Sequence, residues 1–193
     1  TLILGHMNQT VYLTNQFIIA MPSLVDPIFF HTVTYLCQHN EEGALGIVIN
    51  RPLEMKLGDI FKQMNIDFTS SCAAEINVFS GGPVQQEHGF VLHTAGRVWD
   101  STMAVSETVS LTTSRDVIEA IATGKGPEKY LVALGYAGWG QGQLEQEILA
   151  NTWLNSPYSQ NVLFDTEINK RWQGAAEEIG ININELTTQA GHA

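Results

Sequence analysis

A chain of 193 residues with 44% hydrophobic residues is long enough to bury a full core, and we expect one domain over residues 7–193. Its formal net charge of −11, with lysines and arginines scattered singly apart from Lys170 with Arg171, disfavours direct nucleic-acid binding, because that affinity comes mainly from basic side chains that neutralise phosphates. No apolar run approaches the ~18 residues of a membrane span and no signal peptide is visible, which predicts a cytoplasmic protein without membrane contact. Residues 1–6, ahead of Met7, resemble a cloning remnant.

The first half of the chain predicts short strands and one helix. Apolar residues that alternate between turn-forming residues indicate strands, whereas the spacing i, i+3, i+4, i+7 indicates a surface helix. In chain order, these patterns predict strands over residues 17–20, 33–39 and 44–50, a helix over 57–64, a loop over 69–74, and strands over 76–79 and 89–94. The turn Asn40–Gly43 joins two of these strands into a β-hairpin that ends at Arg51 and Pro52.

The second half adds a further hairpin and three helices. In chain order, it predicts strands over residues 103–105 and 109–113, a helix from Ser114 to Gly124, a strand over 131–134, a helix over 143–153, a short strand over 162–164 and a helix over 169–179 that Gly180 caps. The tail from Thr187 is predicted to fray. Because several hairpins precede the one strong strand–turn–helix unit, we expect an α/β fold with a mixed sheet flanked by helices.

The segment over residues 131–153 contains the main candidate binding site. Four glycines, at positions 135, 138, 140 and 142, separate its buried strand from its amphipathic helix. Free amides at a helix start attract phosphates and carboxylates, so a small anionic ligand is a candidate partner here. The candidate ligand-binding residues are Arg51, His93, Trp139, Gly140, Gln141, Gly142 and Gln143. The glycine spacing departs from the dinucleotide fingerprint, and the alternative is that these glycines only let Trp139 turn inward and the helix pack closely.

The alternative function is a thiol-dependent or hydrolytic enzyme. Cys37 and His39 alternate on one predicted strand, so they share a face and could form a nucleophile pair, with His93 as a second candidate base. No serine-hydrolase pentapeptide or zinc-protease motif occurs, and Cys72 and His88 give no regular ligand spacing, so no metal or cofactor is predicted. The two cysteines, without close pairing, indicate reduced thiols.

Five segments stand in order along the chain: AMPSLVDPIF (Ala20–Phe29), YLCQHNEEGALGIVINRPL (Tyr35–Leu53), GGPV (Gly81–Val84), GFVLH (Gly89–His93) and LGYAGWGQGQLEQEI (Leu134–Ile148). Together they resemble the YqgE/AlgH family of bacterial proteins, over nearly all of residues 17–180. The resemblance implies a branched mixed sheet curled into a pseudo-barrel. It also implies a link to transcriptional regulation and alginate production, without an agreed biochemical activity. Because the chain is acidic and lacks a helix-turn-helix signature, regulation through a protein or metabolite partner fits better than operator binding.

Overall fold

The structure is a computed structural model that describes residues 10–190, with side chains described for residues 10–186. Its strands are β1 (Gln16–Ala20), β2 (Val33–Asn40), β3 (Gly43–Val48), β4 (Pro52–Lys56), β5 (Asn77–Ser80), β6 (Val84–Thr94), β7 (Thr102–Ala104), β8 (Val109–Thr112), β9 (Tyr130–Trp139) and β10 (Trp153–Pro157). Its helices are α1 (Leu57–Gln63), α2 (Ser71–Ala74), α3 (Arg115–Ala122), α4 (Gln143–Leu149), α5 (Arg171–Glu177) and α6 (Ile183–Ala190), with a π-helical segment η1 (Asn161–Asp165) and a 3-10 turn η2 (Ile168–Lys170). None of the helices within residues 10–190 has the length and apolar character needed to cross a membrane.

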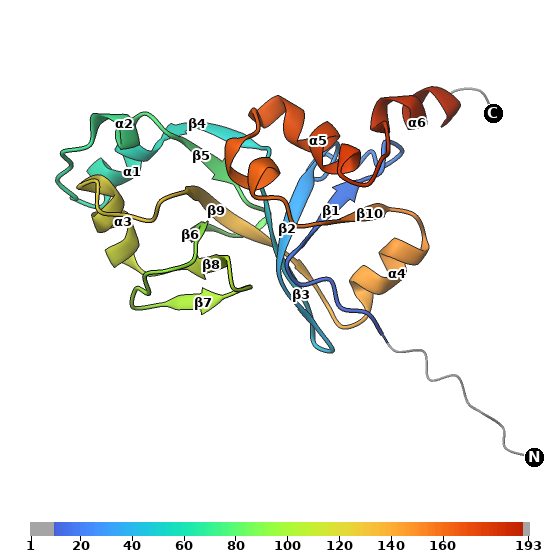
Figure 1. The fold of residues 1–193 in the computed structure, drawn as a ribbon, viewed down its shortest axis with the longest axis horizontal. Helices are drawn as coiled ribbons and strands as arrows, with labels where there is room; N and C mark the ends of the chain where they lie inside the picture. Colours follow the sequence, from blue (N-terminus) through green and yellow to red (C-terminus); the bar gives the residue numbers. More distant parts are fainter. Residues whose placement is uncertain (1–9, 191–193) are drawn as a thin grey trace, which may run out of the picture.

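The strands form one mixed sheet that branches at β9. The main path runs β10-β1-β2-β3-β9-β6-β8-β7, and β4 and β5 form a side branch in which β5 lies parallel to β9. The first half of β9 pairs with β5 and its last residues pair with β3, on the edge opposite β6. The sheet therefore curls into a half-barrel, with α1, α2 and α3 at one end and α4 and α6 at the other (Figure 1). This confirms the predicted α/β fold with a branched, curled sheet and flanking helices.

Gly135 changes the face of the sheet that β9 residues reach. Leu131 and Ala133 belong to the central core, whereas Trp139, which strict alternation would place on the same face, packs in a different cluster beneath α4. Gly135 has a φ of 80°, a left-handed conformation that favours glycine. A Cβ at this position would lie 2.4 Å from the carbonyl oxygen of Gly82. The close approach and the backbone twist both require glycine here.

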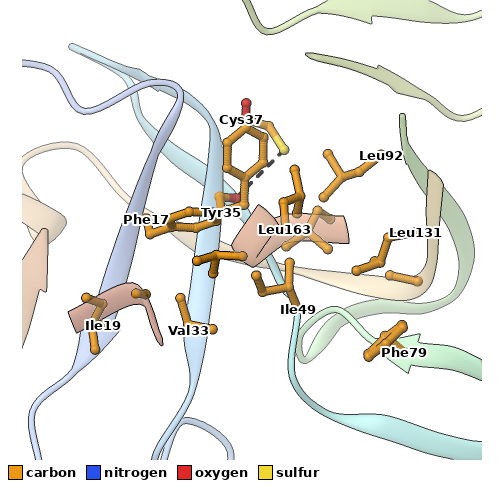
Figure 2. Close-up of a cluster of buried hydrophobic side chains, with 14 of the residues drawn as sticks. Phe17, Ile19, Val33, Tyr35, Cys37, Ile49, Phe79, Leu92, Leu131 and Leu163 are labelled. Atoms are coloured by element: carbon orange, nitrogen blue, oxygen red, sulfur yellow. Dashed lines mark hydrogen bonds between the residues drawn. The ribbon is translucent and has the colours of Figure 1, made fainter. Parts of the chain in front are cut away.

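The central core fills the concave side of the half-barrel. Tyr35 of β2, Leu92 of β6 and Ile49, the residue after β3, surround Leu163 of η1, which enters the core from the C-terminal part of the chain (Figure 2). Two smaller clusters lie beneath the other helices. The first packs α1 and α3 on β9 through Phe61, Ile118 and Val132 among others, and the second packs α4 on β9 through Leu144, Trp139 and Trp153. Burial of these apolar surfaces, at about 25 cal/mol per Å², is what attaches the helices to the sheet.

One strand was not predicted, and two local predictions are wrong. Residues 52–56, for which the sequence patterns predict no element, form the edge strand β4; Pro52 stands at its first position, where a missing amide is tolerated. The predicted loop over residues 69–74 contains α2, whose first turn is capped by Ser70 Oγ accepting from the Ala73 amide at 3.2 Å. Residues 162–164 lie in η1 and not in a strand.

The remaining differences are of length. The strand predicted over residues 131–134 continues to Trp139, because Gly135 and Gly138 are accommodated inside β9. The helix predicted over residues 143–153 ends at Leu149, and Trp153 begins β10, which pairs with β1. Helix α6 continues to Ala190, past the predicted start of fraying at Thr187. The predicted remnant over residues 1–6 lies outside the described residues.

Candidate functional site

The start of α4, the predicted binding corner, is closed by local hydrogen bonds. Gly142 is the residue before the helix and has a φ of 72°. The amide of Gly140 donates to Oε1 of Gln143 at 2.9 Å, and the amide of Gln143 donates to the carbonyl oxygen of Gly140 at 3.1 Å. Two of the amides that would hold an anion are therefore already bonded, while Gln141 lies exposed in the turn between them.

Carboxylates dominate the electrostatics of this corner. Glu147 Oε1 accepts from the indole Nε1 of Trp139 and from that of Trp153, each at 3.3 Å. The carboxylate of Glu145 pairs with His39. Acidic residues of the chain itself, rather than a bound anion, thus interact favourably with the positive end of the α4 dipole. A bound anion would face both carboxylates, so these contacts favour the alternative that the glycines serve packing.

The other two candidate residues lie elsewhere. Arg51 donates through Nη2 to the carbonyl oxygen of Phe30, on the loop between β1 and β2. His93 is fully buried in β6, where its ring lies between the Thr94 carbonyl oxygen and Thr112 Oγ1. The structure brings together Trp139 and residues 140–143, but it does not join them to Arg51 or His93. Anion binding by this set stays a prediction.

The prediction that Cys37 and His39 share a strand face is wrong. A β-bulge interrupts the pairing of β2 with β3 between residues 36 and 38, so Cys37 points into the central core while His39 points to α4. Burial raises the pKa of the Cys37 thiol well above its ordinary value, which disfavours the nucleophilic thiolate. Nδ1 of His39 accepts from the Leu13 amide at 2.9 Å, so Nε2 carries the proton donated to Glu145.

The enzyme alternative is therefore not supported. The Cys37 thiol is inaccessible. Both ring nitrogens of His39 are used in hydrogen bonds: Nδ1 links β2 to Leu13, before β1, and Nε2 links β2 to Glu145 of α4. Within residues 10–190 no group of three or more His, Cys, Asp or Glu side chains is placed to hold a metal ion.

A hollow lies elsewhere, between β6, α1 and α3. We call it the β6 hollow; its volume is about 660 Å³. Its floor is apolar and is formed by Met55, Ile60, Met64, Val91, Ile118 and Val132. Its rim is polar and includes Gln63, Gln86, Glu87, His88, Ser114 and Arg115. This combination of an apolar floor and a few polar groups is typical of small-molecule sites.

An insertion in β6 creates one wall of this hollow. Val84 pairs with Tyr136 and Gly89 pairs with Leu134, so four residues of β6 stand opposite a single residue of β9. Residues 85–88 therefore leave the ladder, and Gln85 adopts a φ of 49°. The other walls come from the apolar face of α3 and from the C-terminal end of α1.

Sequence reasoning missed the β6 hollow. The only local signal is the polar run QQEH at residues 85–88, which interrupts two segments otherwise assigned to the sheet. Such a run resembles an ordinary surface loop. The floor residues come from four separate segments of the chain, and only the fold brings them together.

Comparison with known proteins places the chain in a family. The family model described as AlgH-like matches residues 17–184. A UPF0301 protein of Methylococcus capsulatus is 54% identical over 185 residues, which are 96% of this chain and 98% of that protein. A UPF0301 protein of Xanthomonas campestris is 52% identical over 181 residues, which are 94% and 96% of the two chains.

Solved structures agree with the sequence comparison. The solution structure of the AlgH protein from Pseudomonas aeruginosa has a TM-score of 0.78 and 46% identity, covering 97% of this chain and 100% of that one. A crystal structure of a protein from Corynebacterium diphtheriae has a TM-score of 0.73 over 93% of this chain and 94% of that one; at 18% identity it shows likeness of fold alone. The chain belongs to the AlgH-like family, as the five sequence segments predict.

Proposed function

We propose that the protein is a binding protein without catalytic activity, and that it takes a small amphipathic molecule in the β6 hollow. The observation that carries the proposal is the volume of about 660 Å³ above an apolar floor with a polar rim. Small-molecule sites typically occupy roughly 300–1,000 Å³ and combine these two features. An apolar body would bury against Val91, Ile118 and Val132, and a polar end would remain at the rim.

Regulation through such a ligand, or through a protein partner, suits the charge of the chain better than direct DNA binding. A net charge of −11 repels the phosphate backbone, and the nine lysines and arginines are few. Both cysteines within the described residues are free thiols, which supports a reducing compartment such as the cytoplasm.

Position 89 allows a direct test of this proposal. No atom lies within 4 Å of the point where a Cβ on Gly89 would stand, and Gly89 lines the hollow, so the ring of Gly89→Phe should occupy part of this space. We expect 2-naphthylmethanol, a neutral amphipathic probe, to bind the wild-type protein saturably in an NMR titration, with shifts at the methyl groups of Ile60, Val91 and Ile118. Gly89→Phe should abolish these shifts.

The matched control is Val98→Phe, which adds a phenyl ring at a residue that is 75% exposed and outside the hollow. This variant should bind the probe as the wild type does. Equal binding by Gly89→Phe and the wild type, or the absence of saturable binding to the wild type, would contradict the proposal.

A further inference from the structure

Arg171, at the first position of α5, is a buried cation held by neutral groups. Only 6% of the surface of this residue is exposed to solvent. Nε donates to the carbonyl oxygen of Thr166 at 3.0 Å, and Nη1 donates to that of Ile49 at 2.6 Å. The guanidinium carbon lies 5.3 Å from the centre of the Phe79 ring. These contacts stabilise the cation partly, through carbonyl dipoles and the ring face.

No carboxylate neutralises this charge within the described part of the chain. None lies within 4.0 Å of the guanidinium. Asp165 is near enough to favour the charged form, but both of its carboxylate oxygens accept from Lys129 Nζ at 2.6 Å. Burial lowers the pKa of Arg171 to about 10, which leaves it charged at neutral pH. A buried charge without a counter-ion is costly, and an anionic ligand would remove that cost.

A hollow gives access to this cation. It has a volume of about 360 Å³, and it shares no lining residue with the β6 hollow. Arg171 lines it together with the apolar side chains of Phe79, Phe164 and Ile168. Across residues 10–190, no hydrogen bond reaches Nη2 of Arg171, and this atom is not sealed from solvent. One nitrogen of the guanidinium thus remains available to an acceptor.

We propose that this second hollow binds a small carboxylate with an apolar or aromatic body, and that Nη2 of Arg171 donates to the carboxylate. The apolar walls accommodate the body, while the cation recognises the charged end. A single negative charge is favoured because Glu75, on the rim, repels a second one. A phosphate monoester carries about −1.5 to −2 at pH 7, so it should bind more weakly than a carboxylate.

The first experiment compares three probes of similar shape by calorimetric titration of the wild-type protein. Benzoate should bind saturably, with benzyl alcohol and phenyl phosphate each weaker by about tenfold, because one lacks the charge and the other carries too much. If benzyl alcohol binds as tightly as benzoate, or if benzoate does not bind, the proposal is wrong and Arg171 only links α5 to the residue after β3 through its hydrogen bond to Ile49. If phenyl phosphate binds as tightly as benzoate, the preference for a single charge is wrong.

The second experiment places a charge in the hollow without removing Arg171. Asn77 lines the hollow, and its Oδ1 accepts from Lys56 Nζ. Asn77→Asp keeps that acceptor and adds a negative charge, so benzoate affinity should fall by about tenfold. Asn155→Asp adds the same charge at an exposed residue of β10, outside the hollow, and should leave the affinity unchanged. Equal affinity of the two variants would overturn the proposal, whatever the outcome for the β6 hollow.

Discussion

At the scale of single residues, the neutral form of His93, which burial favours by lowering its pKa, completes a chain of hydrogen bonds. The Thr94 carbonyl oxygen can only accept, so Nδ1 of His93 carries the proton donated to it at 2.9 Å. In the neutral ring Nε2 then accepts from Thr112 Oγ1 at 2.7 Å, and that oxygen lies 2.8 Å from Thr102 Oγ1. Thr102 in turn accepts from the Trp99 amide at 2.8 Å. The buried histidine thus joins β6, β8 and β7, which is a structural role.

Burial lowers the pKa of His93, and this makes stability depend on pH. Above the ordinary value of about 6.5, both states are neutral and the full stability is present. As the pH falls below that value, the unfolded chain binds a proton before the folded protein does, so the free energy of unfolding drops by up to about 1.4 kcal/mol per pH unit until the folded pKa is reached.

Urea denaturation at pH 7.5, 6.5 and 5.5 measures this dependence. We expect His93→Gln to reduce the loss of stability between pH 6.5 and 5.5 relative to the wild type. His31 provides the control, because burial and Arg51 also lower its pKa but it is less buried, so His31→Gln should reduce the loss by less. An unchanged pH dependence in His93→Gln would show that His93 does not couple protonation to folding.

At the scale of elements, β9 depends on glycine at one position. An alanine at Gly135 would carry the cost of left-handed backbone, about 1 kcal/mol, and its Cβ would lie 2.4 Å from the Gly82 carbonyl oxygen. Gly124 has a similar φ of 75°, but no atom lies within 4 Å of the point that a Cβ there would occupy. Gly124→Ala should therefore cost about 1 kcal/mol, and Gly135→Ala clearly more, in the free energy of unfolding by urea. Equal losses would mean that the loop at Gly82 moves freely away from β9.

At the scale of the whole molecule, β9 contributes to all three hydrophobic clusters. Leu131 lies in the central core, Val132 lies beneath α1 and α3, and Trp139 lies beneath α4. Loss of β9 pairing would expose all three clusters at once. We therefore expect residues 10–190 to unfold as one cooperative unit.

The two cysteines report this cooperativity in a single experiment. Cys72 on α2 is exposed, whereas Cys37 is 2% exposed in the central core. One thiol should react with an aromatic disulfide reagent in the native protein, and the second only as urea unfolds the chain, with the same midpoint as tryptophan fluorescence. The variant Cys72→Ser should show no native reaction. Reaction of Cys37 at urea concentrations well below the midpoint would indicate that the part of the central core around β2 unfolds independently.

The candidate sites were only partly predictable. The sequence identifies Trp139 and the glycines at the start of α4 as neighbours, because they are adjacent in the chain. It could not place Arg51 or His93 relative to them, since strand pairing decides those positions. The shared face of Cys37 and His39 fails because one bulge, set by the pairing of β2 with β3, reverses the alternation.

The sequence by itself determined the local features: the hairpin of β2 and β3, the amphipathic helices α1, α3 and α5, the acidic charge and the family. The hairpin and the helices depend on residue spacing over one or two turns or strands, which is encoded locally, whereas the charge follows from composition and the family from five segments along the chain. Only the tertiary structure decided that the sheet branches at β9, and it alone decided the change of face at Gly135, the β6 hollow and the access to Arg171. Each of these arises where segments far apart in the chain meet, and the register of such contacts depends on how distant apolar faces are buried together.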